Sequence, residues 1–333
     1  MSQGHVLVTG GAGYVGSALV PKLLAEGYAV TVLDLYLYGE GKQVFPACND
    51  HPRLRQIKGD LRNAETVRQS LEGVDQVIHL ACISNDPSYD LDPTLGRSIN
   101  YDAFRPLVRA AKAAGVSRFI YASSSSVYGV KEEEDVTEDL PLEPLTDYSR
   151  FKALCEQVLL EERAPGFAVC VIRPSTVCGY APRQRLDLVV NIFTNQAVNN
   201  GRIRVTGGPQ KRPNIHIDDM CAVYLHLLRQ PAERIDGKIW NAGDTNFSIA
   251  ELAGLVRKAI GPHVLIDLQP TNDPRSYRVS GKRIRDEIGF ELTHTIEEAV
   301  QGLAAAIHDG RLTDPLNNPL YFNIKRMQEI KLT

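Results

Sequence analysis

Cysteine is sparse in this chain and forms no metal-binding or redox pattern. The six cysteines among 333 residues lie at least eight positions apart, and no Cys-x-x-Cys occurs. This spacing argues against a zinc ribbon or a thioredoxin-type redox centre and indicates scattered reduced thiols. The eight histidines never recur three or four residues apart, so the sequence contains no helical metal site. We therefore expect no bound metal.

The chain also lacks an excess of one charge and a long hydrophobic run. Lysine and arginine total 37 and aspartate and glutamate total 40, which leaves a formal charge of −3. This balance argues against nucleic acid or an anionic membrane as the main partner. No uncharged apolar run reaches the roughly 18 residues of a membrane helix, and a strand pattern begins at His5, where a signal peptide would still continue. These features predict a soluble, cytoplasmic protein with no membrane partner.

Length and composition are those of a globular α/β chain. At about 150 residues per domain, the chain corresponds to roughly two units or to one large α/β domain. Apolar residues make up 43% and charged residues 23%, which excludes a disordered or fibrous chain. A chain of this length buries roughly three quarters of its surface and needs no disulfide or metal to hold it together.

Short apolar runs alternate with helical patterns through the first half of the chain. Helical patterns follow the first run at Tyr14–Glu26, span Leu95–Ala114 and begin again at Tyr148. Strands separated by helices predict an α/β fold with a parallel, doubly wound sheet of Rossmann type and right-handed crossovers. The predicted strands are His5–Thr9, Ala29–Asp34, Leu54–Lys58, Gln76–Leu80, Arg118–Ala122 and Phe167–Ile172.

The regular alternation of strand and helix patterns ends after Arg173. Strand patterns become shorter and loops more frequent, and no internal repeat or low-complexity linker separates the two halves. We therefore expect a Rossmann domain over residues 1–175 and a smaller C-terminal lobe over residues 176–333. Later residues are expected to add strands or helices to the first domain.

Glycines recur at the first predicted strand–helix junction. The run from Thr9 to Gly16 reads Thr-Gly-Gly-Ala-Gly-Tyr-Val-Gly. In this position one glycine permits a tight turn, one lets the backbone approach a pyrophosphate, and one allows close contact of helix and sheet. The N-terminus of the helix then offers free N–H groups and a positive dipole to the phosphates. The run predicts a dinucleotide site made by Gly10, Gly13, Tyr14, Val15 and Gly16.

An acidic residue at the end of the second predicted strand favours NAD over NADP. Asp34 lies about 20 residues beyond the glycine run, where a carboxylate accepts hydrogen bonds from the adenosine ribose. No arginine or lysine follows it until Lys42, so no nearby cation suits a ribose 2′-phosphate. Two competing motifs are absent, because no Gly-Lys pair is followed by Ser or Thr and Gly-x-Ser-x-Gly does not occur.

Tyr-x-x-x-Lys occurs three times, and one copy has a context that favours catalysis. Tyr38 lies in a glycine-rich loop and Tyr321 in the C-terminal tail, whereas Tyr148 begins a helix that places Lys152 on the same face one turn later. This helix follows the run Ser-Ser-Ser-Ser-Val-Tyr-Gly at residues 123–129, after a predicted strand. A neighbouring ammonium and a cationic nicotinamide would lower the pKa of the phenol. Tyr148 would then take a proton from a substrate hydroxyl while hydride leaves the same carbon.

These motifs, in this order, resemble an extended short-chain dehydrogenase/reductase of the nucleotide-sugar epimerase and dehydratase type. The resemblance covers nearly the whole chain and implies NAD as the cofactor and a nucleotide-diphosphate sugar as the substrate. Beside the glycine run and the Tyr148/Lys152 pair, it is carried by Gly59-Asp60-Leu61, Val77-Ile78-His79-Leu80-Ala81, Ile99-Asn100, Ser126-Val127-Tyr128-Gly129 and Arg173-Pro174.

The resemblance assigns roles to residues along the cofactor and the reacting sugar. It implies Ser124 as the catalytic hydroxyl beside Tyr148 and Lys152, and Lys152 as a further ligand of the nicotinamide ribose. The other cofactor contacts that it implies are Asp60 and Leu61 near the adenine, Leu80 and Ala81 along the cleft, and Asn100 near the nicotinamide.

The resemblance also implies that the second lobe binds the nucleotide diphosphate. The run Lys211–Asp219 resembles the family's Arg-Asp-Tyr-Ile-His-Val-x-Asp segment, which makes Arg212 a phosphate ligand, although Pro213 replaces the usual Asp. Arg275 resembles the family's second diphosphate arginine, and guanidinium forks suit phosphates. The remaining expected substrate contacts are Arg185, Asn191 and Thr176, of which Thr176 stands where the family commonly has Asn.

Two serines separate this chain from the family's dehydratases. Those enzymes carry Asp-Glu directly after the catalytic hydroxyl, and the related decarboxylases carry Glu at the second of these positions. Here the two positions are Ser125 and Ser126. A serine without a partner is no base near neutral pH, so the expected chemistry is oxidation and reduction at C4 by Ser124, Tyr148 and Lys152 alone.

Three functions are compatible with this set of residues. We expect an NAD-dependent nucleotide-sugar epimerase, which returns the hydride to the other face of a 4-keto sugar. The alternative is a 4-dehydrogenase or 4-ketoreductase that releases its product. A remote alternative is a non-catalytic NAD-binding sensor, which would normally lack the Tyr/Lys pair. The family often dimerises through the helices at Leu95–Ala114 and Tyr148–Arg163, so we also expect a homodimer.

Overall fold

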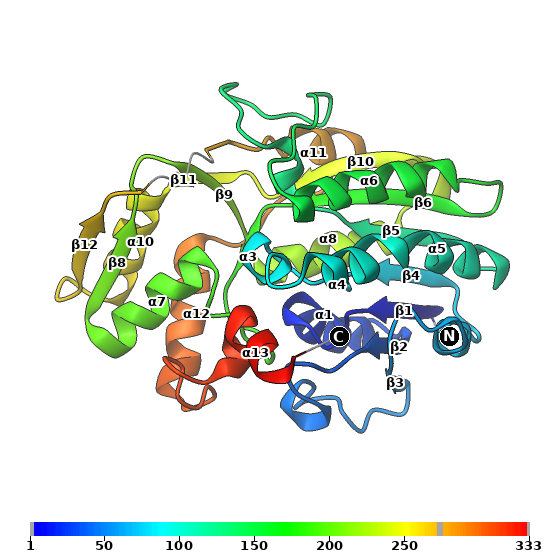
Figure 1. Ribbon diagram of the computed structural model, residues 1–333, viewed down its shortest axis with the longest axis horizontal. Coiled ribbons are helices and arrows are strands. Elements are labelled where there is room, and N and C mark those ends of the chain that lie inside the picture. Colours follow the sequence, from blue (N-terminus) through cyan, green and yellow to red (C-terminus); the bar gives the residue numbers. More distant parts are fainter. Residues whose placement is uncertain (1–2, 272–275, 332–333) are drawn as a thin grey trace.

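A seven-stranded sheet forms the centre of the protein. The computed structural model describes residues 3–271 and 276–331. The strands run in the order β10–β6–β5–β4–β1–β2–β3, and every neighbouring pair is parallel. This doubly wound order confirms the predicted Rossmann-type α/β fold (Figure 1). The strands are β1 (His5–Thr9), β2 (Ala29–Asp34), β3 (Leu54–Lys58), β4 (Gln76–His79), β5 (Arg118–Ala122), β6 (Ala168–Pro174) and β10 (Lys238–Ala242).

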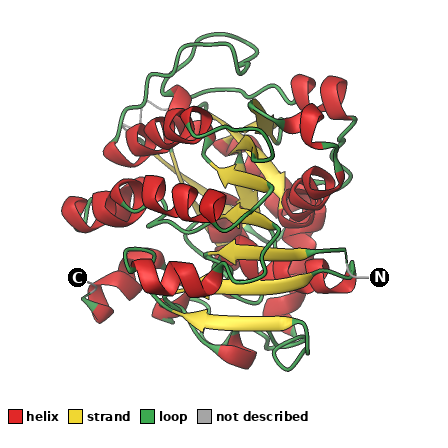
Figure 2. Ribbon diagram, turned by 90° about the vertical axis from the view of Figure 1, so that its right-hand side faces the viewer, coloured by secondary structure: helices red, strands yellow, loops and turns green. Residues whose placement is uncertain are grey.

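Helices cover both faces of this sheet (Figure 2). Side chains of a strand alternate between the faces, so Val6 and Val8 contribute to one apolar core while Leu7 contributes to the other. The first core is closed by α1 (Tyr14–Ala25), α8 (Ile217–Arg229), α9 (Ala232–Ile235) and α11 (Lys282–Ile288). The second is closed by α2 (Ala64–Ser70), α5 (Phe104–Ala113) and α6 (Asp147–Glu161).

The sheet draws on both halves of the chain. Strand β10 pairs with β6, and α8 packs beside α1, although both elements lie beyond residue 175. Trp240 of β10 is fully buried in the first apolar core. The C-terminal half therefore both builds the smaller lobe and completes the Rossmann sheet.

The helix predicted over Leu95–Ala114 is divided by a wide turn. The structure has α4 (Pro93–Arg97), a π-helical turn at Ser98–Asp102 and then α5. The side chain of Asn100 explains the turn, because it accepts the Ile83 N–H at 2.8 Å and donates to the Ile83 carbonyl at 3.0 Å. Such π-turns often occur at functional sites. Here the turn fixes the backbone that follows β4.

The smaller lobe has a separate apolar core. It contains the three-stranded sheet β11–β9–β7 and the parallel pair β12–β8, and α7, α10 and α12 contribute the buried side chains (Figure 1). Its elements are β7 (Thr176–Cys178), α7 (Val189–Asn200), β8 (Arg202–Thr206), β9 (Lys211–His216), β11 (Thr245–Ser248), α10 (Ile249–Ile260), β12 (Leu265–Gln269) and α12 (Ile296–His308).

Short helices join these layers. Among them, α3 (Asp86–Tyr89) follows β4, and α13 (Asn323–Ile330) lies near the end of the chain. In the described ranges, no helix has the length and hydrophobicity needed to cross a bilayer. The remaining short turns are the 3₁₀ segments Gly41–Gln43, Ser125–Tyr128 and Pro319–Tyr321.

Two glycines allow the first strand–helix turn to approach its neighbours. Gly10 has φ +73°, and a Cβ atom there would lie 2.6 Å from the backbone of Ala81. A Cβ atom on Gly16 would lie 2.4 Å from the carbonyl oxygen of Gly11. The turn therefore touches both the start of α1 and the residues after β4, which is the switch point of the sheet.

Alanine substitutions should separate this packing requirement from ordinary helix propensity. Gly16→Ala should lower the free energy of unfolding by roughly 1–3 kcal/mol, because its methyl group meets backbone atoms that cannot move aside. Gly254→Ala is the matched control, since Gly254 lies exposed within α10 and a Cβ there would meet nothing within 4 Å. It should raise the free energy of unfolding by about 0.4–1 kcal/mol. Urea denaturation measures both values, and equal stability of the two variants would contradict the packing argument.

Candidate active site

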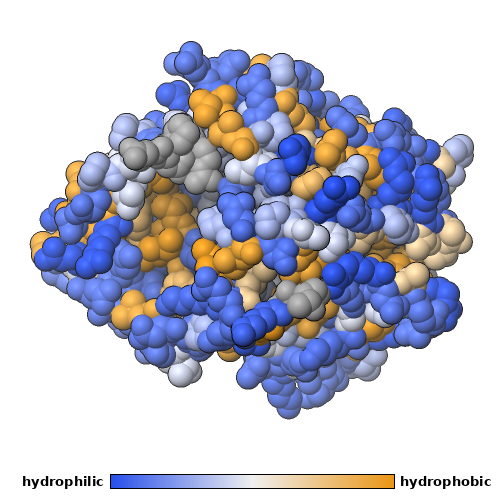
Figure 3. All heavy atoms as spheres, in the orientation of Figure 1, coloured by the Kyte–Doolittle hydropathy of each residue, from blue (hydrophilic) through white to orange (hydrophobic). Residues whose placement is uncertain are grey.

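A cavity of about 420 Å³ opens where the parallel strands end. The space-filling view shows that hydrophilic side chains cover most of the visible face (Figure 3). A group of apolar side chains lies between the sheet and the smaller lobe. Nearly all the predicted cofactor residues line the cavity, and Asn100 lies behind its wall. Those that line it are Gly10, Gly13, Tyr14, Val15, Gly16, Asp34, Asp60, Leu61, Leu80, Ala81, Tyr148 and Lys152.

The glycine turn offers the groups that a dinucleotide requires. Gly13 precedes α1 and supplies no side-chain cap, and the first turn of α1 contains no acidic residue. The N–H groups at this helix end and its dipole can therefore bind a pyrophosphate. Asp34 follows at the end of β2, where its carboxylate accepts N–H groups from Ala12 at 3.0 Å and Tyr36 at 2.7 Å. Burial raises the pKa of Asp34, and these hydrogen bonds oppose the shift.

A cation that the sequence analysis did not predict lines the same cavity as Asp34. The guanidinium of Arg183 stacks on the ring of Tyr38 at 3.7 Å and interacts electrostatically with Asp34. The prediction that no arginine or lysine lies near Asp34 is correct only for its neighbours in the sequence. Lys42, the next cation along the chain, pairs instead with Asp50 at 3.2 Å.

Residues at the far end of the cofactor groove are held by local bonds. The carboxylate of Asp60 accepts the Arg62 backbone N–H at 2.8 Å and pairs with its guanidinium at 2.7 Å. Burial alone would raise the pKa of Asp60, and the bonds to Arg62 bring it below the usual value. Asn100 fixes the backbone at Ile83, as described above, so its effect on the cofactor would be indirect.

Ser124, Tyr148 and Lys152 come together at the other end of the cavity. Ser124 follows β5 and begins a 3₁₀ turn, while the capping box of Thr146 and Ser149 starts α6 so that Tyr148 and Lys152 fall in its first two turns. The Lys152 ammonium lies 5.9 Å from the centre of the Tyr148 ring. Lys152 is only 4% exposed and donates to the Ala122 carbonyl at 2.6 Å.

Burial controls the acidity of the Tyr148 phenol. It raises the pKa of Tyr148 well above 10, and the electrostatic effects of Cys82 and Asp86 act in the same direction. Arg185 and a hydrogen bond with Ser124 lower the pKa, but burial outweighs them. The expectation of a lowered pKa includes the cationic nicotinamide, so it stays a prediction for the chain with cofactor bound. That positive charge would act against the effect of burial.

Two serines and one carboxylate surround the catalytic group. Ser125 and Ser126 both line the cavity, and the Ser126 hydroxyl lies 2.8 Å from that of Ser124. Of the described lining residues, three are acidic, and Asp86 is the one that acts on Tyr148. Asp86 accepts the Thr146 hydroxyl at 2.6 Å. The sequence analysis missed Asp86, because no motif marks the loop after β4.

The expected substrate residues occupy different positions relative to the cavity. Thr176, Arg185 and Arg212 line it. Asn191 is fully buried behind it and donates to the Arg185 carbonyl at 2.8 Å, so its direct contact with substrate remains a prediction. Arg275 lies outside the described residues.

One nitrogen of the Arg185 guanidinium has no hydrogen-bond acceptor in the protein. Its Nε donates to Asp187 at 2.8 Å and one terminal nitrogen donates to the Ser84 hydroxyl at 3.2 Å. The other terminal nitrogen, Nη2, is buried without a hydrogen-bond partner. A buried unpaired donor of this kind is costly, and an oxygen of a bound ligand would satisfy it.

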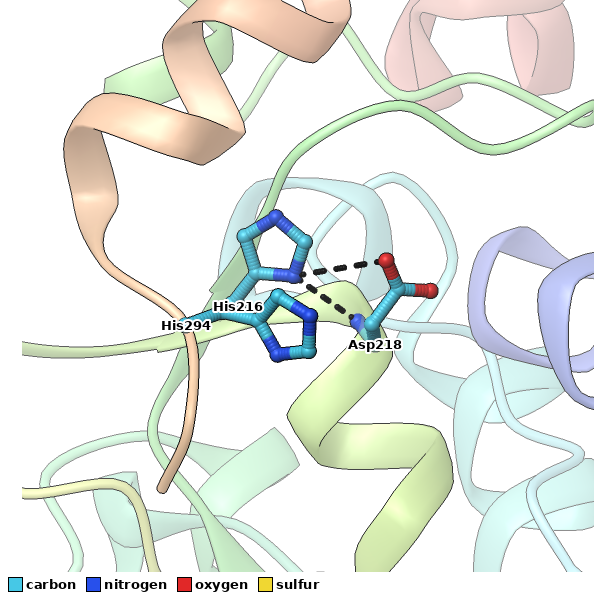
Figure 4. A group of neighbouring side chains, drawn as sticks. All are labelled: His216, Asp218 and His294. Atoms are coloured by element: carbon cyan, nitrogen blue, oxygen red, sulfur yellow. Dashed lines mark hydrogen bonds and ion pairs between the residues drawn. The ribbon is translucent and has the colours of Figure 1, made fainter.

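Three side chains with metal-ligating atoms meet outside the cavity. His216, Asp218 and His294 each bring one such atom to within 4.8 Å of the others (Figure 4). Each has a partner in the chain: His216 Nδ1 accepts the Asp218 N–H at 3.0 Å, Asp218 pairs with Lys22 at 3.0 Å, and His294 bonds Asp219 at 2.7 Å. The imidazole rings stack with an interplanar angle of 15°, so no point close to both nitrogens lies in both ring planes. We assign this group a structural role between α8 and α12.

Comparison with known proteins places the chain among nucleotide-sugar enzymes. A family model described as "NAD dependent epimerase/dehydratase family" matches residues 6–243. The chain is 32% identical over 321 residues to a dTDP-glucose 4,6-dehydratase of Streptomyces griseus, covering 92% of this chain and 95% of that protein. It is 26% identical over 312 residues to a UDP-glucose 4-epimerase of Lactobacillus helveticus, covering 87% and 92%.

A solved structure supports the same comparison. The structure of DesIV, a dTDP-glucose 4,6-dehydratase from Streptomyces venezuelae, superposes with a TM-score of 0.83 at 26% identity and covers 95% of this chain and 99% of that one. It was determined with NAD bound. The predicted cofactor, NAD, is confirmed. Epimerases and dehydratases both occur among the relatives, so the reaction has to be argued from the residues of the site.

The preference for NAD over NADP can be tested at Asp34. The wild-type chain should bind NAD at least roughly tenfold more tightly than the 2′-phosphorylated form, because the carboxylate accepts ribose hydroxyls and repels a phosphate. Asp34→Asn should narrow the difference between the two affinities, since the negative charge that repels a 2′-phosphate is removed. Calorimetric titration with both dinucleotides measures the two affinities. Equal or reversed affinities of the wild type would contradict the predicted preference for NAD.

Proposed function

Because the chain belongs to the NAD-dependent epimerase/dehydratase family, we propose that it is a nucleotide-sugar epimerase that oxidises and then re-reduces C4 of the sugar. One observation carries the proposal: Ser124, Tyr148 and Lys152 converge in the cavity, while the next two positions hold Ser125 and Ser126. This set supports proton and hydride transfer at a carbinol carbon. It contains no acid–base pair after the catalytic hydroxyl for removal of water.

Tyr148 is the proposed base, and Ser124 orients the reacting hydroxyl. The two side chains line the same cavity, and Ser124 lies close enough to lower the pKa of the phenol, so a C4 hydroxyl between them would meet a donor and an acceptor at once. NAD⁺, when bound, accepts the hydride and brings the positive charge that favours the phenolate. Lys152 is fixed by the Ala122 carbonyl and holds its ammonium close to the Tyr148 ring.

Arg185 and Arg212 are the proposed ligands of the nucleotide-diphosphate sugar. Both line the cavity and belong to the C-terminal half of the chain. Arg185 has the free Nη2 donor described above and acts electrostatically on Tyr148, so it lies close enough to contact the sugar. Guanidinium donors suit oxygen-rich anions because they form a rigid fork.

The proposed role of Tyr148 can be tested with a matched pair of variants. Tyr148→Phe should lower turnover by roughly 10²- to 10⁴-fold, because the proton acceptor is lost, and should leave NAD binding largely intact. Tyr321→Phe is the control, since Tyr321 has the same spacing to a lysine but accepts the Thr313 N–H outside the cavity. Product formation from a panel of UDP-, dTDP-, GDP- and CDP-sugars measures the turnover of both variants. Near wild-type activity of Tyr148→Phe would refute the assignment.

The proposed chemistry also predicts the fate of hydrogen during the reaction. In heavy water the product should keep the mass of the substrate and carry no solvent deuterium at C4 or C5, because the hydride returns directly to C4. Accumulation of a 4-keto sugar together with NADH would instead indicate a dehydrogenase. Mass spectrometry and NMR of the products distinguish these outcomes.

A third outcome would identify a dehydratase. A product lighter by one water, with solvent deuterium at C5, would overturn the argument from Ser125 and Ser126. Asp86→Asn then locates the group responsible, because Asp86 is the carboxylate that acts on Tyr148. Loss of elimination in that variant would make Asp86 the missing acid.

A further inference from the structure

The C-terminal helix α13 lies across the cofactor end of the cavity. Its first residue, Asn323, lines the cavity and is only 2% exposed, although it is 289 positions beyond Asp34. In Figure 1 the helix lies beside the end of the sheet that carries β1, next to α4. The helix belongs to neither the glycine turn nor the catalytic group, and no motif in the sequence gives it a function.

Three polar groups of Asn323 connect the two sides of the cavity. Its side-chain amide donates to the Ser84 hydroxyl at 2.9 Å, and its backbone N–H donates to Asp187 at 2.9 Å. Its side-chain oxygen accepts a hydrogen bond from the guanidinium of Arg183. Ser84 follows β4, whereas Arg183 and Asp187 lie on the loop before α7. One buried residue therefore fixes both segments.

The rest of α13 extends this connection to β2. The Arg326 guanidinium donates to the carbonyl of Leu37 at 2.6 Å, just beyond the strand that ends at Asp34. Met327 is buried in a small apolar cluster with Ile83 and Ile99, which lie on the β4 side. The helix thus bridges the ends of β2 and β4, which lie on either side of β1 and its glycine turn.

Arg183 carries the second, independent observation. It is 4% exposed, it stacks on Tyr38, and its Nε is buried without a hydrogen-bond partner. Burial lowers the pKa of Arg183 to about 10, so the group remains cationic near neutral pH. A buried cation with an unpaired donor in the cavity that Asp34 also lines needs an acceptor that the chain does not supply.

We propose that Arg183 is a cofactor-binding residue and that α13 holds it across NAD, so that the cofactor dissociates only when the contacts of Asn323 and Arg326 break. The free Nε would bond an oxygen of the pyrophosphate or of the adenosine ribose. This inference rests on NAD binding and not on which reaction follows. For an epimerase it has a clear consequence, because the same cofactor must stay in place between oxidation and reduction.

The test measures cofactor release without any sugar. Asn323→Ala should raise the dissociation rate of NAD roughly tenfold or more, since it removes the acceptor that positions Arg183 and the bridge to Ser84. Asn317→Ala is the matched control, because Asn317 is exposed on the same C-terminal segment and bonds only with Asp314. Its release rate should stay within about twofold of the wild type. Stopped-flow displacement of bound NADH by excess NAD gives the rates.

Two further variants keep the proposal testable if Asn323→Ala unfolds. Arg326→Ala removes a partly exposed contact to Leu37 and should also speed release. Arg183→Lys keeps the charge but cannot bond Asn323 and NAD with the same fork, and should weaken NAD binding roughly tenfold. Thermal unfolding without NAD monitors the fold of each variant.

Unchanged NAD release in the folded Arg326→Ala and Arg183→Lys variants would overturn the proposal. Weaker binding of a nucleoside diphosphate such as UDP to the NAD-loaded Arg183→Lys variant, with NAD affinity unchanged, would also overturn it, since Arg183 would then serve the substrate. Neither result depends on turnover. Failure of this inference and failure of the proposed epimerase reaction are therefore distinguishable.

Discussion

The close approach of the first strand–helix turn to the end of β4 is the constraint on which the site depends. No side chain fits at Gly10, because its Cβ would lie 2.6 Å from the backbone of Ala81. This contact brings the N-terminus of α1, Asp34 and the loop after β4 around one groove. Because parallel strands end at the same edge of the sheet, Ser124 after β5 and Tyr148 at the start of α6 face the same groove. The proposed catalytic residues and the predicted cofactor residues therefore meet as a consequence of topology.

The smaller lobe is tied to this turn by buried polar contacts. The hydroxyl of Tyr14, directly after the glycines, donates to the Gly179 carbonyl at 2.6 Å and accepts the Asn191 amide at 3.1 Å. Asn191 also holds the backbone at Arg185, so the loop that presents Arg183 and Arg185, two of the three described arginines that line the cavity, is positioned from the cofactor side. A boundary at residue 175 divides the sequence, but the residues of the site are held together across it.

Local patterns in the sequence predicted the parts of the site that short segments determine. Strands β1, β2, β3 and β5 have the predicted bounds, and the glycine turn and the Tyr148 helix lie where their motifs place them. The parts that were missed depend on contacts distant along the chain. Arg183 reaches Asp34 only after the smaller lobe folds, Asn323 reaches the cavity through α13, and the wide turn at Asn100 exists because of its bonds to Ile83. The periodicity and spacing of residues in the sequence do not predict such contacts.

Burial links the retention of the cofactor to the chemistry. Burial raises the pKa of Tyr148 well above 10. The positive charge of NAD⁺ would lower this pKa and so would favour the proposed role of Tyr148 as a base. If Arg183 and α13 keep NAD in the groove, they also keep the base active through successive turnovers. The same low-dielectric cavity that makes the phenol a weak acid on its own thus couples proton transfer to the presence of the oxidised cofactor.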